Sequence, residues 1–370
     1  MADSPVDPAE LEARGLYDPE APDAADRLEL IEYLLSLGAT IQDILEAGDD
    51  LPVVASMVAM RPGKERLTLA EAADRAGVPV ETARRIWRAG GLPEPEPDVR
   101  ACTEADVEVL RTFLAGQELF GETVTLQMAR VVGSAVARVA DATVSAFVVN
   151  VGAPSLAEDP AGLALARANA DAATLLPGLS RALDTMLRHH FEASRRPIDA
   201  GSGLLRGYDS QELAVGFVDL VDSTRLAQQL STAELGDALG EFEARAADTI
   251  VTQGGRLVKL IGDDVMYVVS DADTACAIAL ELADSLAADD VLPSVRSGIA
   301  AGEVLTRDGD YFGPVVNLAA RAVKLADPDT VLASGALARA ASGYRFASVG
   351  APRLKGFDEP VELFRLERAG

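Results

Sequence analysis

The segment AVGFVDLVDST at residues 214–224 is an apolar run that ends at acidic residues, and LVKLIGDDVM at residues 257–266 repeats this pattern. Short apolar runs bounded by turn residues predict buried β-strands. Gly262-Asp263 predicts a tight turn into a further strand over residues 265–269. If these strands are neighbours, Asp219 and Asp263 project at the same end of one sheet.

Two carboxylates without a nearby cysteine or histidine suit Mg²⁺ or Mn²⁺ rather than zinc. After Asp219 the pattern predicts a helix that begins at Asp222 or Ser223, and a helix N-terminus beside a divalent ion favours a polyphosphate. Asp219 and Asp263 therefore indicate a metal–nucleotide site in a chain that has no P-loop motif. The alternative is that each is only a turn or capping residue, which is a common use of aspartate.

The composition favours a soluble protein with two domains. The chain has 370 residues, and its formal net charge of −26 argues against binding to nucleic acid or to anionic membranes. Cys102 and Cys276 form no metal-binding spacing, which is typical of a cytoplasmic protein. The acidic N-terminus does not resemble a signal peptide. The most apolar segment, residues 123–153, carries three charged residues and predicts a buried helix pair, so no membrane span is expected.

Composition and periodicity divide the chain into four parts. Residues 1–26 are acidic and proline-rich and predict a mobile arm. Residues 27–195 show helical spacing of apolar residues, and they include the only histidines, His189 and His190. Residues 196–210 read as a linker that contains glycine and serine. Strands and helices are expected to alternate over residues 211–370.

Residues 67–114 resemble the helix-turn-helix and the start of the wing of MerR-type regulators. Helices are expected at residues 67–73 and 80–89 and from about residue 104, with a turn at Gly77-Val78-Pro79. The second helix carries Arg84, Arg85 and Arg88, but many acidic residues surround it. We therefore favour a structural use of this segment over DNA binding, which stays an alternative.

The C-terminal half predicts an α+β domain whose sheet is mixed and whose helices cover one face. Strands are expected at residues 213–219, 256–270 (a hairpin), 294–305, 330–333 and 361–365, and helices at residues 224–252, 272–288 and 314–326. A loop is expected at residues 306–310. Asn317 and Arg321 are four residues apart and share one helix face, where an amide and a guanidinium can hold ribose and phosphoryl oxygens.

These motifs together resemble the class III nucleotidyl cyclases. The shared features are FVDLVDST at residues 217–224, KLIGD at 259–263, GIAAGEV at 298–304 and NLAAR at 317–321, in this order. The resemblance covers residues 211–370 and implies the ferredoxin-like catalytic fold of that family. One departure is Asp222, which stands where many members have glycine.

The resemblance implies that Asp219 and Asp263 hold two Mg²⁺ or Mn²⁺ ions in each active site. Lys259 and Asp310 match the pair that recognises adenine, because a lysine donates to a ring nitrogen and a carboxylate accepts from the exocyclic amine. Guanylate cyclases have glutamate and a cysteine or similar small residue there, so ATP is the expected substrate and adenylate cyclase the expected activity.

Asn317 would orient the ribose, and Arg321 would stabilise charge on the α-phosphate in the transition state. Lys355 matches a triphosphate-binding lysine. In this family the catalytic domains form a head-to-tail homodimer, in which one chain supplies the two metal-binding aspartates and its partner supplies the other groups. A catalytically silent sensor with the cyclase fold is the remaining alternative for this half.

The N-terminal half resembles the helical autoinhibitory domain of the pH-responsive class III adenylate cyclases. That resemblance implies a dimerising regulatory domain and a fatty-acid ligand within it. Histidine titrates near pH ~6.5, so His189 and His190 are candidate regulatory residues. The alternative is that both are ordinary surface residues.

Overall fold

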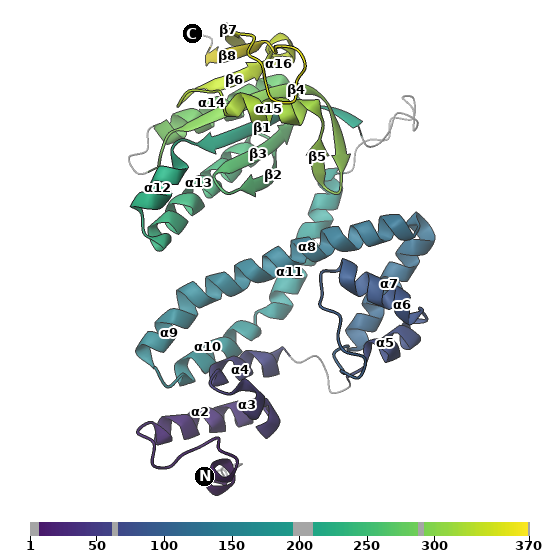
Figure 1. Cartoon of the computed structure of the whole chain (residues 1–370), viewed down its shortest axis with the longest axis vertical. Helices are drawn as coiled ribbons and strands as arrows, with labels where there is room; N and C mark the ends of the chain where they lie inside the picture. The colour runs from purple at the N-terminus through teal and green to yellow at the C-terminus, as the bar shows by residue number, and fades with distance from the viewer. Residues whose placement is uncertain (1–6, 61–65, 195–209, 288–291, 369–370) are drawn as a thin grey trace. The chain divides into compact units, whose positions relative to one another are not determined.

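The computed structural model describes residues 7–60, 66–194, 210–287 and 292–368 (Figure 1). The chain forms two compact units, Met1–Pro197 and Ile198–Gly370, and each is described separately below. Residues 1–6 of the expected arm and residues 196–209 of the expected linker lie outside the described residues.

The second unit is built on one mixed sheet, as the sequence predicts. Its strands follow the order β2-β3-β1-β4-β6-β8-β7, and β5 pairs with β4. The β4–β6 pair is parallel and the other pairs are antiparallel. The strands are β1 (Ser210–Leu220), β2 (Arg256–Ile261), β3 (Asp264–Val269), β4 (Val295–Arg307), β5 (Asp310–Phe312), β6 (Val331–Ser334), β7 (Tyr344–Gly350) and β8 (Leu363–Arg368).

Helices cover both faces of this sheet, so the expectation of helices on one face was wrong. The last eight residues of β1 are all buried, which is typical of a strand covered on both sides. Val218 belongs to a core shared with α13 (Thr232–Thr252), α14 (Ala272–Ala287) and α16 (Gly335–Ala340). Val215 and Phe217, of opposite parity along the strand, pack with α15 (Pro314–Val323).

Three local predictions in this unit also need correction. The single helix expected at residues 224–252 is two helices, α12 (Ser223–Gln229) and α13, because Ser231 forms a capping box with Glu234 and starts a new helix. The loop expected at residues 306–310 is instead a hairpin between β4 and β5. Strand β7 was not predicted, and it pairs with β8 at the edge of the sheet.

The described part of the first unit is built from helices joined by loops, as expected. Its helices are α1 (Pro8–Ala13), α2 (Ala24–Ser36), α3 (Ile41–Ala47), α4 (Leu51–Ala59), α5 (Leu69–Ala76), α6 (Val80–Ala89), α7 (Glu104–Phe120), α8 (Glu122–Phe147), the π-helix η1 (Val148–Gly152), α9 (Ala153–Glu158), α10 (Leu163–Ala173) and α11 (Leu176–Ser194). The prediction of a mobile arm was wrong for residues 7–26, which include α1 and the start of α2. Leu11 of α1 and Leu16 are buried in a core with Ile31 and Leu34 of α2.

The helix-turn-helix segment folds around its own small core, which includes Ala72, Ile86 and Leu110. Leu67 pairs with Cys102 in an isolated β-bridge ahead of α7. The arginines of α6 lie in ion pairs with glutamates: Arg84 with Glu81 and Glu94, Arg85 with Glu122, and Arg88 with Glu81 and Glu94. The positive charge that a DNA-binding helix would present is therefore matched locally by carboxylates.

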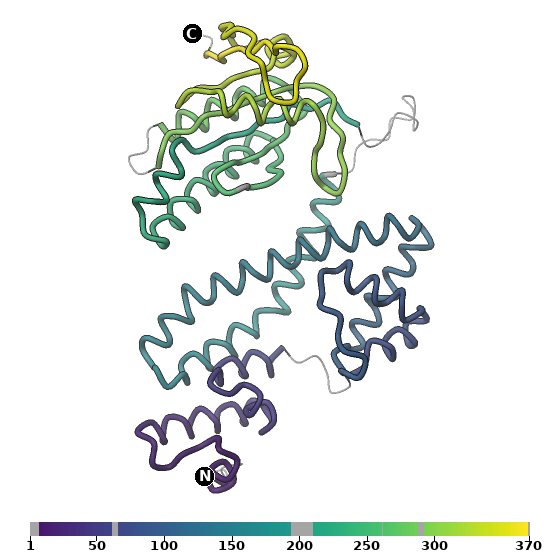
Figure 2. The backbone as a smooth tube through the Cα atoms, viewed as in Figure 1, coloured from purple at the N-terminus to yellow at the C-terminus, as the bar shows by residue number. Residues whose placement is uncertain are grey.

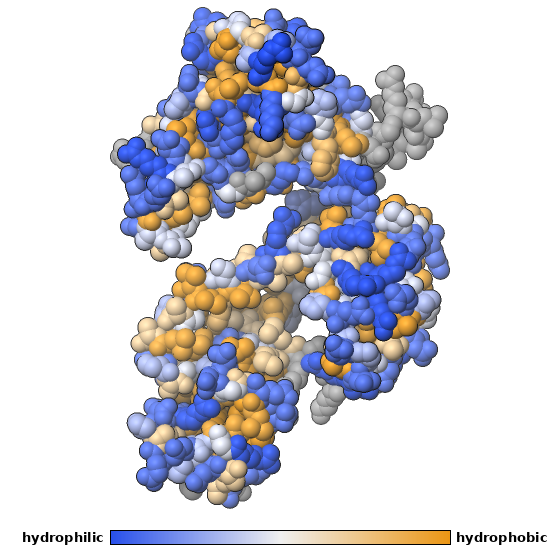
Figure 3. Space-filling model, viewed as in Figure 1, coloured by the Kyte–Doolittle hydropathy of each residue, from blue (hydrophilic) through white to orange (hydrophobic). Residues whose placement is uncertain are grey.

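The buried helix pair expected at residues 123–153 was also a wrong prediction. Helix α8 runs on through η1 into α9, as the backbone trace in Figure 2 shows. This helix is long and apolar enough to cross a membrane by length and composition, and none of its most apolar window is buried. Its exposed side chains include Val132, Val144, Val149 and Leu156. Apolar side chains gather on this part of the surface in Figure 3.

Candidate active site

The acidic cluster begins with a row of three charged residues across neighbouring strands. Asp219 near the end of β1 is in register with Asp264 of β3 on one side and with Arg296 of β4 on the other. Side chains in register on adjacent strands lie on the same face of the sheet. Because Asp219 has the same parity as Val215 and Phe217, this row lies on the face that α15 covers.

Asp263 joins the row from the two-residue turn between β2 and β3. Gly262 occupies the first turn position with φ 66°, a conformation that favours glycine. The carbonyl oxygen of Asp263 accepts a 3.2 Å hydrogen bond from the backbone N–H of Leu220, which holds the turn against the end of β1. The hydroxyl of Ser223 donates a hydrogen bond to the Asp263 carboxylate.

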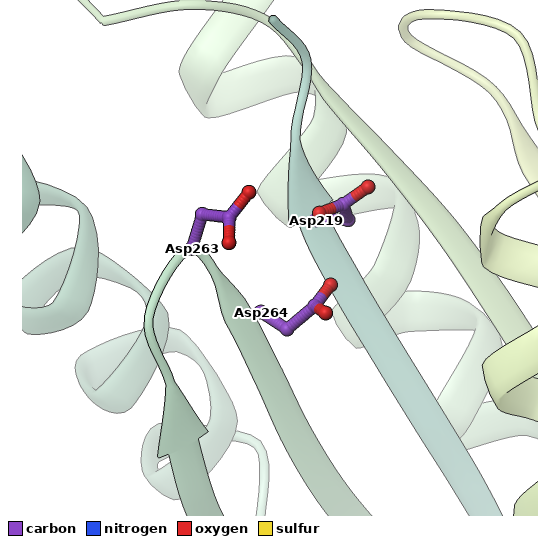
Figure 4. A group of neighbouring side chains, drawn as sticks. All are labelled: Asp219, Asp263 and Asp264. Carbon is purple, nitrogen blue, oxygen red and sulfur yellow. The ribbon is translucent and has the colours of Figure 1, made fainter. Parts of the chain in front are cut away.

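The carboxyl groups of Asp219, Asp263 and Asp264 converge at this end of the sheet (Figure 4). One carboxylate oxygen from each lies within 4.8 Å of the other two. The structure thus brings together the two predicted metal-binding residues and adds Asp264, which sequence reasoning missed. The signal was present, because Asp264 directly follows Asp263 and starts the next strand, but only the register places it opposite Asp219.

Two basic side chains contact this acidic cluster. Arg296 donates to Oδ2 of Asp219 from Nε, at 2.7 Å, and its Nη2 lies 2.5 Å from the same oxygen. The ammonium nitrogen of Lys324, the residue that follows α15, lies 3.1 Å from Oδ1 of Asp219 and 3.2 Å from both oxygens of Asp264. Neither contact was predicted, since both depend on how β4 and α15 pack against β1.

The cluster has unusual proton affinities. Burial opposes ionisation of Asp219, but hydrogen bonds with Asp264, Lys324 and Arg296 outweigh it and lower the pKa of Asp219. Burial, then the hydrogen bond and negative charge of Asp219, raises the pKa of Asp264 to about 6. Burial opposes the charge on Lys324, but its hydrogen bonds to Asp219 and Asp264 raise the pKa of that ammonium group. The contacts therefore favour the ionised form of Asp219, whereas Asp264 holds its proton more strongly than an ordinary aspartate.

A pocket of about 490 Å³ opens over the cluster. Its polar lining includes Asp219, Asp263, Arg296 and Lys324, together with the first residues of α12. Asp222, at the N-cap of α12, has φ 56° in the left-handed region, a conformation that favours glycine. Asp222 occupies the predicted N-cap position, but its side chain makes no capping hydrogen bond.

Lys259 and Asp310 form a second cluster, although they are 51 residues apart. The ammonium nitrogen of Lys259, on β2, lies 2.5 Å from Oδ2 of Asp310, at the start of β5. Both side chains are about one-third exposed, so they are accessible to a ligand. Within the described residues, no hydrogen bond or ion pair joins this pair to Asp219, Asp263 or Asp264.

The remaining predicted residues lie on exposed surfaces. Asn317 and Arg321 are both exposed on α15, one helical turn apart, as expected from their spacing. Lys355 is exposed in the loop between β7 and β8. His189 and His190 are exposed on α11, and Nδ1 of His189 lies 4.0 Å from a carboxylate oxygen of Glu192.

Comparison with known proteins identifies both halves of the chain. Residues 10–193 match the adenylate cyclase regulatory domain, and residues 206–368 match the adenylate and guanylate cyclase catalytic domain. An adenylate cyclase of Streptomyces coelicolor is 38% identical over 303 residues, which are 80% of this chain and 77% of that protein. A pH-sensitive adenylate cyclase of Mycobacterium tuberculosis is 29% identical over 359 residues, which are 93% of this chain and 88% of that protein.

An uncharacterised protein of Mycobacterium tuberculosis is 37% identical over 360 residues, covering 96% of this chain and 93% of that protein. The resemblance predicted from the motifs is confirmed for both halves. The chain therefore belongs to the class III adenylate cyclases, and it joins an adenylate cyclase regulatory domain to a catalytic domain of that enzyme family.

Proposed function

We propose that this protein converts ATP to 3′,5′-cyclic AMP and pyrophosphate at sites shared between two copies of the chain. The observation that carries the proposal is that one catalytic unit holds both an acidic cluster suited to divalent ions and a Lys259–Asp310 pair suited to adenine. Asn317 and Arg321 complete the set of groups expected in a cyclase active site. A catalytically silent sensor with the cyclase fold would have no need of these groups.

The acidic cluster fits Mg²⁺ or Mn²⁺. Its three groups are carboxylates within 4.8 Å of one another, and hard divalent cations prefer such oxygen ligands. Asp219 and Asp263 would hold two ions, with Asp264 as a further carboxylate. When bound, these ions would supply positive charge to the triphosphate and acidify the ribose 3′-hydroxyl.

Lys259 and Asp310 would select the base. Lys259 supplies donors only and ionised Asp310 acceptors only, which complements an adenine edge with one ring-nitrogen acceptor and one exocyclic amine donor. The ion pair between them brings side chains from two different strands, β2 and β5, together. A nucleotide base entering between them would exchange one ion pair for two hydrogen bonds.

Asn317 and Arg321 would act on the sugar and the phosphate. An exposed amide can hold a ribose oxygen in the orientation needed for in-line attack on the α-phosphorus. The guanidinium one turn later can donate to the equatorial oxygens, where negative charge develops in the transition state. Both groups are placed by a helix packed against the sheet, which limits their movement.

The two clusters of one chain are expected to serve different sites of a head-to-tail dimer. The absence of hydrogen bonds between them, among the described residues, agrees with this arrangement. A symmetric pair then contains two equivalent composite sites. Mixing Asp219→Ala and Arg321→Ala chains in equal amounts tests this directly. Random pairing should restore about one quarter of the natural cyclic AMP production, because half of the dimers regain one of two sites.

The two single variants, assayed alone, are the matched controls and should be almost inactive. If the mixture is no more active than the controls, the shared site is wrong. If Asp219→Ala and Arg321→Ala chains each keep the natural rate, the residue assignments are wrong as well.

The regulatory unit is expected to pair with its copy through the exposed apolar side of α8, η1 and α9. Soluble proteins rarely leave so extended an apolar surface uncovered, and a self-complementary face suits a dimer. Regulation by pH through His189 and His190, or by a fatty acid within this unit, follows only from the family resemblance. Cyclic AMP production measured across pH, with natural protein and with both histidines replaced by glutamine, tests the first of these.

A further inference from the structure

The basic residue Lys324 has no role in the activity proposed above, yet it contacts two groups of the acidic cluster. It directly follows α15, and its ammonium nitrogen lies 3.1 Å from Asp219 and 3.2 Å from each oxygen of Asp264. These are oxygens that a divalent cation bound between the carboxylates would also need.

Arg296 and Lys324 hold Asp219 in different ways. Arg296 lies on the central strand β4 and directs two nitrogens at Oδ2 alone, so its planar group is fixed by the sheet. Lys324 contacts the other oxygen, Oδ1, and its side chain is 47% exposed compared with 28% for Arg296. Lys324 carries a flexible, strongly hydrated ammonium group on a half-exposed side chain, so releasing these oxygens costs it less than releasing Oδ2 costs the more buried Arg296.

We propose that Lys324 sets the divalent-ion affinity of the catalytic unit, because its ammonium group competes with the metal ion for oxygens of Asp219 and Asp264. This inference rests on the proposed metal-dependent function. Lys324 thereby weakens metal binding, so that the bound ion exchanges more readily with solution. Entry of a cation requires Lys324 to release Oδ1 of Asp219, while Arg296 continues to orient the same carboxylate through Oδ2.

Mn²⁺ binding to the full-length protein without nucleotide tests this proposal, with free Mn²⁺ measured by electron paramagnetic resonance. Lys324→Met keeps most of the side-chain volume and removes the charge, so it should bind Mn²⁺ about tenfold more tightly. Lys324→Arg keeps the charge and should remain near the natural affinity. Arg365→Met is the matched control, because it removes one exposed positive charge that pairs with Glu367 elsewhere in the same unit.

Tighter Mn²⁺ binding by Lys324→Met, with Arg365→Met unchanged, supports the proposal. Equal or weaker binding by Lys324→Met overturns it, and so does an equal gain in Arg365→Met, which would indicate only a general charge effect. Absence of Mn²⁺ binding in every variant also overturns it. Cyclic AMP formation by the natural protein, assayed in parallel, shows whether the proposed function stands when the Lys324 proposal fails.

Thermal unfolding of each variant in the presence of a chelator provides the folding control. Lys324 is nearly half exposed, so its replacement should change the unfolding temperature by little. An unfolded variant would bind no Mn²⁺, and its loss of structure would be recognised by thermal unfolding. In that case Lys324→Gln, with a polar side chain of similar length, replaces Lys324→Met under the same criteria.

Discussion

Gly298 lies in β4 beneath α15, and replacing it with alanine should displace the helix that carries Asn317 and Arg321. A Cβ at this position would lie 2.2 Å from the backbone nitrogen of Val323 and 2.5 Å from the carbonyl oxygen of Ala319. Both neighbours are backbone atoms, so no rotamer change can relieve the clash. Opening the shorter contact to an ordinary 3.4 Å needs a movement of about 1.2 Å.

Such a movement has two expected consequences. Overpacking of a well-packed core costs about 1–3 kcal/mol. In a domain of this size each 1 kcal/mol lowers the unfolding temperature by about 2–4 °C. A shift of about 1 Å in a group that orients the substrate can slow the reaction about 100-fold. Gly298→Ala should therefore unfold several degrees lower and make cyclic AMP up to about 100-fold more slowly.

Initial rates of cyclic AMP formation and thermal unfolding measure both effects. Gly240→Ala is the matched control, because Gly240 is exposed in α13 and its added Cβ would meet nothing within 4 Å. That change should stabilise the protein by about 0.5–1 kcal/mol and leave the rate unchanged. Natural stability and a natural rate in Gly298→Ala would refute the packing argument for the position of α15.

Three further predictions concern protonation, base selection and regulation. Burial and Asp219 raise the pKa of Asp264 from 3.8 to about 6. In the presence of a chelator, protonation of Asp264 therefore stabilises the folded protein. This stabilisation is complete below about pH 4 and is lost as the pH rises through about 6. Asp264→Asn should therefore exceed the natural stability at pH 7, by on the order of 2 kcal/mol, and match it near pH 4; the reverse order would contradict this. Combining Lys259→Glu with Asp310→Cys should shift the preference from ATP toward GTP by at least about tenfold, measured as the ratio of kcat/KM values, and an unchanged ratio would exclude these residues from base recognition. Removing residues 1–196 should raise cyclic AMP production if the regulatory unit inhibits, whereas an unchanged rate in a fragment shown to dimerise would argue against inhibition.

The sequence predicted the parts of the catalytic unit whose signals are local. The apolar runs identified β1 and the β2–β3 hairpin, and Gly262 marked the turn that carries Asp263. The order of motifs was sufficient to recognise the family. The missed break between α12 and α13 was also a local signal, because the Ser231–Glu234 capping box is visible in the sequence.

Burial was predicted less well than secondary structure, because it depends on what lies beside an element. The apolar stretch that includes α8 was expected to be buried, yet most of its apolar side chains are exposed in a single chain. The acidic N-terminal segment was expected to be mobile, yet Leu11 anchors α1 in a core. In both cases composition indicated the kind of residue present, and only packing determined whether the residue is covered.

By itself, the sequence determined most strands and helices of the catalytic unit, the family, and the residues available for chemistry, since hydrophobic period and motif spacing are written along the chain. Only the tertiary structure decided that Asp264 and Arg296 flank Asp219 and that Lys324 reaches the same carboxylate. The physical reason is that strand register and helix packing bring together residues that are far apart in the sequence. Asp219 and Lys324 are 324 − 219 = 105 positions apart, and no local sequence pattern encodes such a contact.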